Sequence, residues 1–138
     1  MKTTRFGVSM DDELLERLDH LVARRHYPNR SEAIRDLVRA ALVEDEWVSS
    51  HGEVIGVLVI LFDHHQRDLS SRLLQKEHRR PRNVVTTLHL HLDHHNCLEA
   101  KVIRGTAREV QEIADELISM KGVKFGRLIP ATAGKDLR

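Results

Sequence analysis

A short alternating segment at the start of the chain constrains the fold more than any other feature. Phe6, Val8 and Met10 alternate with polar or small residues, which is the period of a strand with one apolar face. Two helical patterns follow it, and neither offers the strand a partner. Since two short helices bury little surface alone, the simplest solution is a dimer in which two such strands pair antiparallel above four helices.

The two helical patterns have clear starts. The first begins after Asp11 or Asp12, either of which can cap it, and Pro28 prevents it from continuing. Asn29 is a good cap for a second helix, which carries its apolar residues on one stripe and ends near Trp47. A dimer of strand–helix–helix units is the ribbon–helix–helix arrangement, in which a two-stranded ribbon enters the major groove of DNA.

The outward side of the first strand would face the bases of double-stranded DNA. Arginine reads guanine with two hydrogen bonds, serine bonds donors or acceptors, and glycine permits close approach of the backbone. The backbone amides that open the second helix would hold a phosphate. Net charge does not decide the matter, because 22 Lys and Arg nearly balance 21 Asp and Glu; the alternative is a dimerisation module only. The DNA-binding candidates are Arg5, Gly7, Ser9, Asn29, Arg30 and Ser31.

The pattern changes in the second half of the chain. Strands are predicted at 53–62, 83–92, 97–103 and 123–129, and helices at 64–77 and 106–120, the latter capped by Thr106. The order β-α-β-β-α-β is the ferredoxin-like pattern, so the predicted class is α+β. The predicted divisions are a ribbon–helix–helix domain at 1–48, a linker at 49–52, a second domain at 53–132 and a tail at 133–138.

Histidine is unusually frequent, with ten residues against a single cysteine. His89 and His91 share one face of their strand, and Cys97 lies opposite the apolar residues of the next strand. Because the apolar faces of a hairpin coincide, Cys97 falls on the histidine face. Such ligands suit nickel, copper, zinc or cobalt and exclude magnesium and calcium. We expect the leucines of these strands, and not the metal-ligating side chains, to lie beneath the helices.

A fourth ligand would close this site, and His78 is the best candidate. His78 follows the helix expected to cover the leucine face, so it cannot easily reach the opposite face of its own sheet. It would instead complete the site of a neighbouring chain. Glu99 shares the metal-ligand face and would accept a hydrogen bond from a ligand imidazole. The sequence leaves open the roles of His64, His65, His94 and His95, and whether Glu32 and Asp36 bind a cation or form a solvated helix face.

Composition excludes several classes of function. Aromatic residues make up 4% of the chain, too few for a stacking platform for single-stranded nucleic acid. The longest apolar run, Val54 to Phe62, is too short to span a membrane, and no secretory signal is visible. A single cysteine fits the reducing cytoplasm. We find no nucleophile–base pair and no phosphate loop, so the chain is not expected to be an enzyme.

The whole chain up to Ile129 resembles the nickel-responsive ribbon–helix–helix repressors, the NikR family. The similar segments are Asn29–Asp36, Arg67-Asp68-Leu69 with the later His78, His89-Leu90-His91, and Cys97-Leu98-Glu99. The resemblance implies an ACT-like second domain and a homotetramer built as a dimer of dimers. It also implies one square-planar Ni(II) per chain, bound by His89, His91 and Cys97 of one chain and His78 of another.

The function implied by the resemblance is repression of nickel-uptake genes by binding operator DNA when Ni(II) is bound. Family members often carry larger polar residues where this chain has Gly7, which leaves the operator sequence open. One alternative is a ribbon–helix–helix regulator that responds to copper, cobalt, zinc or an amino acid. Another is a metal storage or chaperone protein that merely dimerises through its N-terminus.

Overall fold

The computed structural model describes residues 2–49, 52–66 and 68–137, which form two compact units. The units are Met1–Ala41 and Leu42–Arg138, so their boundary falls within one long helix. Positions 50 and 51 of the predicted linker lie outside the described residues, and the predicted domain boundaries stay predictions. Among the described residues, no helix is long and apolar enough to cross a membrane.

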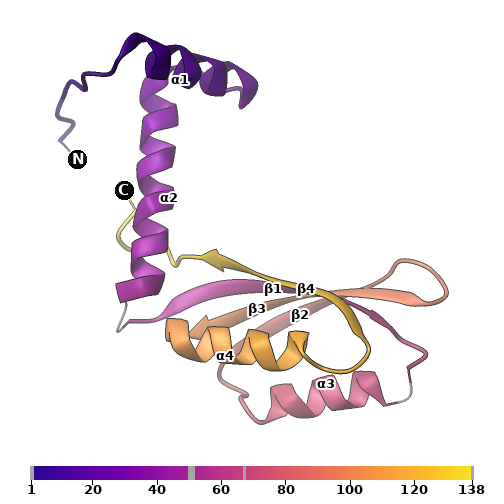
Figure 1. Ribbon diagram of the computed structural model, residues 1–138. Helices are drawn as coiled ribbons and strands as arrows, with labels where there is room; N and C mark the ends of the chain where they lie inside the picture. The colour runs from indigo at the N-terminus through magenta and orange to yellow at the C-terminus, as the bar shows by residue number, and fades with distance from the viewer. Residues whose placement is uncertain (1, 50–51, 67, 138) are drawn as a thin grey trace. The chain divides into compact units, whose positions relative to one another are not determined.

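The first unit contains helix α1 and the start of helix α2 (Figure 1), and each helix begins at a side-chain cap. Helix α1 (Asp12–Arg24) starts where the carboxylate of Asp11 accepts a hydrogen bond of 2.9 Å from the amide of Leu14. At the start of α2 (Arg30–Ser49), the side chain of Asn29 accepts a bond of 2.9 Å from the amide of Glu32. Both predicted caps are confirmed.

The segment ahead of α1 forms no strand in the single chain, within the described residues 2–10. Phe6 and Val8 are 76% and 59% exposed. A strand needs a partner for its amides and carbonyls, and a single copy of this segment has none beside it. The pairing of this segment between two copies therefore stays a prediction.

The second unit is a four-stranded antiparallel sheet in the order β2-β3-β1-β4. Its strands are β1 (Val54–Asp63), β2 (Val84–His91), β3 (Asn96–Gly105) and β4 (Val123–Ala131). Helix α3 (Leu69–His78) follows β1 and α4 (Ala107–Ile118) follows β3, so the predicted ferredoxin-like order is confirmed. Figure 1 shows both helices on one side of the sheet.

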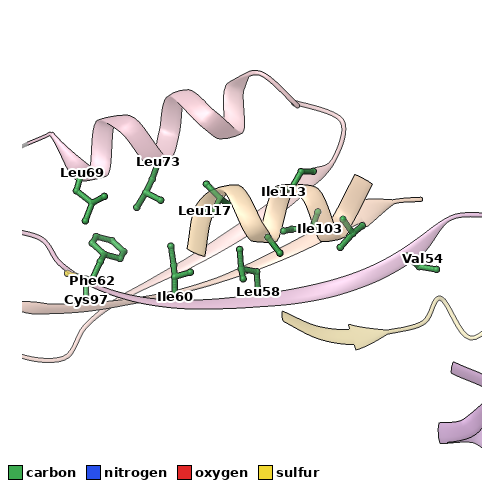
Figure 2. Close-up of a cluster of buried hydrophobic side chains, with 12 residues drawn as sticks. Val54, Leu58, Ile60, Phe62, Leu69, Leu73, Cys97, Ile103, Ile113 and Leu117 are labelled. Carbon is green, nitrogen blue, oxygen red and sulfur yellow. The ribbon is translucent and has the colours of Figure 1, made fainter. Parts of the chain in front are cut away.

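The core of the second unit lies between the sheet and these two helices (Figure 2). In α3, Leu69 and Leu73 are buried, whereas Leu74 is 52% exposed. The buried residues of β1 and the helices are Val54, Leu58, Ile60, Phe62, Leu69, Leu73, Val110, Ile113, Ala114 and Leu117.

The helices cover the face of the sheet that carries Cys97, so our prediction that they cover the leucine face was wrong. Cys97 is fully buried and pairs with Phe62 of β1. Leu88 and Leu90 lie on the other face and are 67% and 51% exposed. The alternation of apolar and polar residues in β2 and β3 gave the wrong face for the helices. The neighbouring strand β1 is apolar on both faces and does not itself indicate which face the helices cover.

Helix α3 begins at Leu69, later than the predicted start at His64. The carboxylate of Asp63 accepts a hydrogen bond of 2.9 Å from the amide of His65, which forms a turn directly after β1. Asp68 has a φ of 67°, in the left-handed region, so the helix cannot extend back through it.

Candidate metal centre

The turn between β2 and β3 sets the register of the candidate ligands. Asp93 accepts hydrogen bonds of 2.8 Å from the amides of His95 and Asn96. Bonds from the side chain of Asn96 and from these amides lower the pKa of Asp93 to about 2. The turn places His91 directly opposite Cys97, which confirms that these two side chains share one face.

Cys97 and His91 are in direct contact, with Sγ and Nδ1 3.1 Å apart. Burial raises the pKa of the Cys97 thiol, and the charges of Glu99, Asp63 and Asp93 raise it further. Such a thiol keeps its proton until a cation displaces it. Thiolate sulfur and imidazole nitrogen are ligands that transition metals prefer, so the contact is suited to such a metal.

His64 joins this pair, although sequence reasoning did not assign it a role. The ligand atoms of His64, His91 and Cys97 all lie within 4.8 Å of one another. Nδ1 of His64 is buried and has no hydrogen-bond partner among the described residues. A sequence signal was present: Phe62 faces Cys97, and His64 follows it by one strand period.

The surroundings of His64 favour the neutral form of its ring. Burial lowers the pKa of His64, and the neighbouring His65 and His91 lower it further. A buried polar atom without a partner costs about 1–3 kcal/mol, a cost that a bound metal would offset. The residues present therefore fit a metal of the kind that the donor set favours.

The other two predicted ligands lie outside this group of three. His89 shares the face, with its ring centroid 4.8 Å from that of His91. Its Nδ1 lies 3.6 Å from Oε1 of Glu99, within the range of an ion pair. His78 is exposed at the end of α3. Our reason for placing it on the wrong side of its sheet was incorrect, because α3 packs into the same core as Cys97.

Further imidazoles connect the Cys97–His91 contact to the exposed turn between β2 and β3. The ring centroid of His64 lies 5.4 Å from that of His91 and 4.0 Å from that of His65. His65 in turn lies 5.3 Å from His95, centroid to centroid. His94 is exposed in the same turn. The structure thus brings three of the four histidines of open role toward the metal-ligand face.

The DNA-binding candidates lie in the first unit. The predicted base-reading residues are exposed ahead of α1: Arg5, Gly7 and Ser9. The predicted phosphate-holding residues open α2: Asn29, Arg30 and Ser31. Within the described residues, no atom lies within 4 Å of where a side chain on Gly7 would begin, so the backbone is open there. Arg30 donates bonds of 2.7 and 2.8 Å to the two oxygens of Asp19, so its guanidinium has a partner within the chain.

Glu32 and Asp36, for which the sequence left open a role in binding a cation, both have partners within the chain. Glu32 forms an ion pair with Arg35, one helical turn away. Asp36 accepts a hydrogen bond of 2.7 Å from the hydroxyl of Tyr27 and lies 3.6 Å from Arg39. These contacts favour the interpretation of a solvated helix face.

Two known families match consecutive parts of the chain. Residues 4–45 match the ribbon-helix-helix proteins of the copG family, and residues 55–131 match the NikR C-terminal nickel-binding domain. Among solved structures, an uncharacterized protein of Thermotoga maritima superimposes with a TM-score of 0.52 at 10% identity. The match covers 59% of this chain and 100% of that one, and it supports the fold alone.

Relatives similar over nearly the full chain carry the name "Putative nickel-responsive regulator". The protein of Geobacter sulfurreducens is 54% identical and that of Geobacter metallireducens 52% identical, each over 136 residues that cover 99% of this chain and 98% of the relative. The protein of Desulfovibrio desulfuricans is 53% identical over 134 residues, 96% of each chain. The chain therefore belongs to the NikR family of nickel-responsive regulators, with a ribbon–helix–helix DNA-binding domain followed by a nickel-binding domain.

Proposed function

We propose that this chain binds operator DNA when nickel is bound and represses genes for nickel uptake. Family membership gives the coarser statement, that it is a nickel-responsive transcription regulator and not an enzyme. The observation that carries the proposal is the 3.1 Å contact between Sγ of the buried Cys97 and Nδ1 of the exposed His91. Bound nickel supplies a charge that replaces the thiol proton and joins ligands from separate segments.

The proposed ligand set is His89, His91 and Cys97 from one copy and His78 from a second, with one nickel per chain. The first three share a face of the hairpin. His78 is exposed at the end of a helix, where a second copy has access to it. Glu99 would accept the Nδ1 proton of His89, which leaves Nε2 of that ring free for the metal.

The proposed assembly is a tetramer built as a dimer of dimers. Two separate apolar surfaces are open in the single chain, and each requires a cover. One belongs to the first unit and includes Phe6 and Val8. The other is the open face of the sheet, where the exposed residues are Leu88, Leu90, Phe125 and Ile129. Pairing through both surfaces closes a symmetric assembly of four copies.

Such an assembly would couple the nickel site to DNA. A ligand contributed by a second copy fixes the geometry between copies, and that geometry sets the spacing of the two ribbons over two half-sites. Arg5 and Ser9 would read bases from the ribbon, Gly7 would allow close approach, and residues 29–31 would hold phosphate. We propose that the protein acts in the cytoplasm, which a DNA partner and a single cysteine would both fit.

Nickel titration tests the metal part of this proposal. Wild type should develop a thiolate–nickel charge-transfer band that saturates at one nickel per chain, and a labelled operator fragment should shift only with the metal. Cys97→Ala should lose both the band and the shift. His94→Ala, an exposed histidine in the same turn, is the matched control and should keep both. An unchanged band in Cys97→Ala would contradict the assignment.

Mixing two inactive variants tests the shared ligand. His78→Ala and the double variant His89→Ala/Cys97→Ala should each lack the band alone. Co-refolded together, they should regain part of it, because one copy supplies His78 while another supplies the remaining three ligands. If the mixture stays silent while mass spectrometry shows that subunits have exchanged, the site lies within one copy.

A further inference from the structure

Lys101 is the one lysine or arginine that the described residues bury, and it lies beside the metal-ligand face. It is 1% exposed in β3 and lies on the same helix-covered face as Glu99 and Cys97, at a spacing of two residues. Removing an ammonium from water costs several kcal/mol unless partners compensate, and an apolar side chain at this position avoids that cost. The retained charge therefore calls for a role that an apolar residue cannot fill.

Three acceptors surround the ammonium, which matches its three donors. Nζ donates to the carboxylate of Glu77 on α3, to Oε2 of Glu99 at 3.0 Å and to Oγ1 of Thr87 at 3.4 Å. The side chains of Glu77 and Glu99 are themselves only 13% and 11% exposed. One positive and two negative charges thus form a nearly closed network between α3, β2 and β3.

One end of this network reaches His89. Oε2 of Glu99 is held by Lys101, which directs the other oxygen, Oε1, toward Nδ1 of His89 at 3.6 Å. Without Lys101 the carboxylate is free to rotate about its terminal bond. An acceptor fixed at Nδ1 selects the tautomer that leaves Nε2 free for a metal.

The other end of the network reaches His78. Among the described residues of α3, only Leu69 and Leu73 are buried, and both lie in the first half of the helix. The last turn has no apolar anchor among these residues, and Glu77, directly before His78, is attached to the sheet through Lys101. The ion pair therefore fixes the position from which His78 projects.

We infer that Lys101 is a positioning residue of the nickel site, because its ammonium holds Glu99 toward His89 and fixes the end of α3 that carries His78. The inference rests on the proposed function and assigns no new ligand. It concerns a residue that contacts none of the ligands directly and acts through the two carboxylates.

Two variants of the full chain separate positioning from stability. Lys101→Met removes the ammonium that the largely buried carboxylates of Glu77 and Glu99 share, so it should lower both the unfolding stability of the metal-free protein and the nickel affinity. Glu77→Gln/Lys101→Met removes a charge of each sign and should regain most of that stability. Its nickel affinity, measured by competition with a chelator, should remain lowered roughly 10–100-fold, with an altered charge-transfer band. Arg104→Met, on the same strand as Lys101, breaks an exposed ion pair with Glu53 and should match wild type in affinity.

The outcomes distinguish this inference from the proposed function. If wild type shows no charge-transfer band, the proposed nickel site itself fails. If wild type shows the band and the double variant regains nickel affinity together with stability, Lys101 is only structural and the inference is overturned. Hydrogen exchange gives a second readout: the amides of residues 77 and 78 should exchange faster in the double variant and unchanged rates there would also overturn it.

Discussion

The two units of this chain differ in how much of their apolar surface they bury alone. The unit Leu42–Arg138 encloses a continuous core between its sheet and two helices. Within the described residues of Met1–Ala41, Ala33 is the only buried hydrophobic residue, and Phe6 is 76% exposed. The metal-binding half therefore has its framework in one copy, whereas we propose that the DNA-binding half closes its core only with a second copy.

Hydrogen bonds and ion pairs in the first unit do not supply the stability that a buried core would provide. Its helices are connected by the pair Arg30–Asp19 and by the bond from Tyr27 to Asp36, all at exposed positions. Exposed ion pairs contribute about 0–1 kcal/mol each, less than the burial of one large apolar side chain. Association should therefore decide whether the first unit is folded, while the second unit should be largely insensitive to it.

The largest expected effect comes from removing a core side chain of the second unit. Phe62 is fully buried beside Cys97, and Phe62→Ala should cost about 3–5 kcal/mol through lost burial and the remaining cavity. Urea unfolding, followed at several protein concentrations, measures it. The loss should be independent of concentration; a loss that grows on dilution would show that the second unit also depends on association.

Nickel should stabilise the two units unequally. Binding only to the folded state at a free concentration of 100 times Kd adds about 2.7 kcal/mol, and this should appear in the second unit. Hydrogen exchange in the absence of DNA measures the two halves separately. Amides of the β2–β3 hairpin should gain protection, and amides of α1 should gain little. Equal protection in both would mean that metal binding already orders the first unit.

Phe6 in the first unit, unlike Phe62 in the second, should affect stability only through the association of copies. Phe6→Ala should weaken dimerisation by roughly 1.5–3 kcal/mol if the ring is buried between two copies. Sedimentation and concentration-dependent thermal unfolding would detect the change, and the nickel charge-transfer band should persist. Thr3→Ala, an exposed neighbour, serves as the control. If Phe6→Ala leaves the concentration dependence unaltered, the ribbon does not form the dimer contact.

Short-range sequence signals allowed the helix caps and the shared face of the hairpin ligands to be predicted. The caps Asp11, Asn29 and Thr106 depend on residues within one turn, and the structure forms all three. The shared face of His91 and Cys97 follows from strand period and from a short hairpin turn. These features were predictable because their causes lie within a few residues of one another.

The failed predictions depended on contacts distant in the chain. Which face α3 and α4 cover is decided by packing on β1, and that strand is apolar on both sides. The start of α3 was misplaced because the side chain of Asp63 accepts a hydrogen bond from the amide of His65, which competes with the helical pattern. Lys101 gave no sequence signal, since its burial depends on a carboxylate from α3 and another from its own strand.

The smallest expected effect compares the helix caps of the two units. Oγ1 of Thr106 accepts a bond of 3.2 Å from the amide of Glu109, and Glu109 accepts one of 3.1 Å in return. Thr106→Ala should cost about 1 kcal/mol, as should Asp11→Ala in the first unit. Urea unfolding should show the first loss at any protein concentration, whereas the second should appear as a shift in the concentration-dependent transition.

The pH dependence of the unfolding free energy gives a further test of the cap at Thr106. The bond from the backbone amide of Thr106, followed by that from its side chain, lowers the pKa of Glu109. The stabilisation is therefore present above the unfolded pKa of a glutamate and is lost as pH falls through the lowered folded value. The difference between wild type and Thr106→Ala should shrink over that acidic range, while Thr106→Ser, which keeps the hydroxyl acceptor, should follow wild type. A pH-independent difference would mean that the side chain of Thr106 does not contribute to lowering the pKa of Glu109, because Thr106→Ala keeps the bond from the backbone amide.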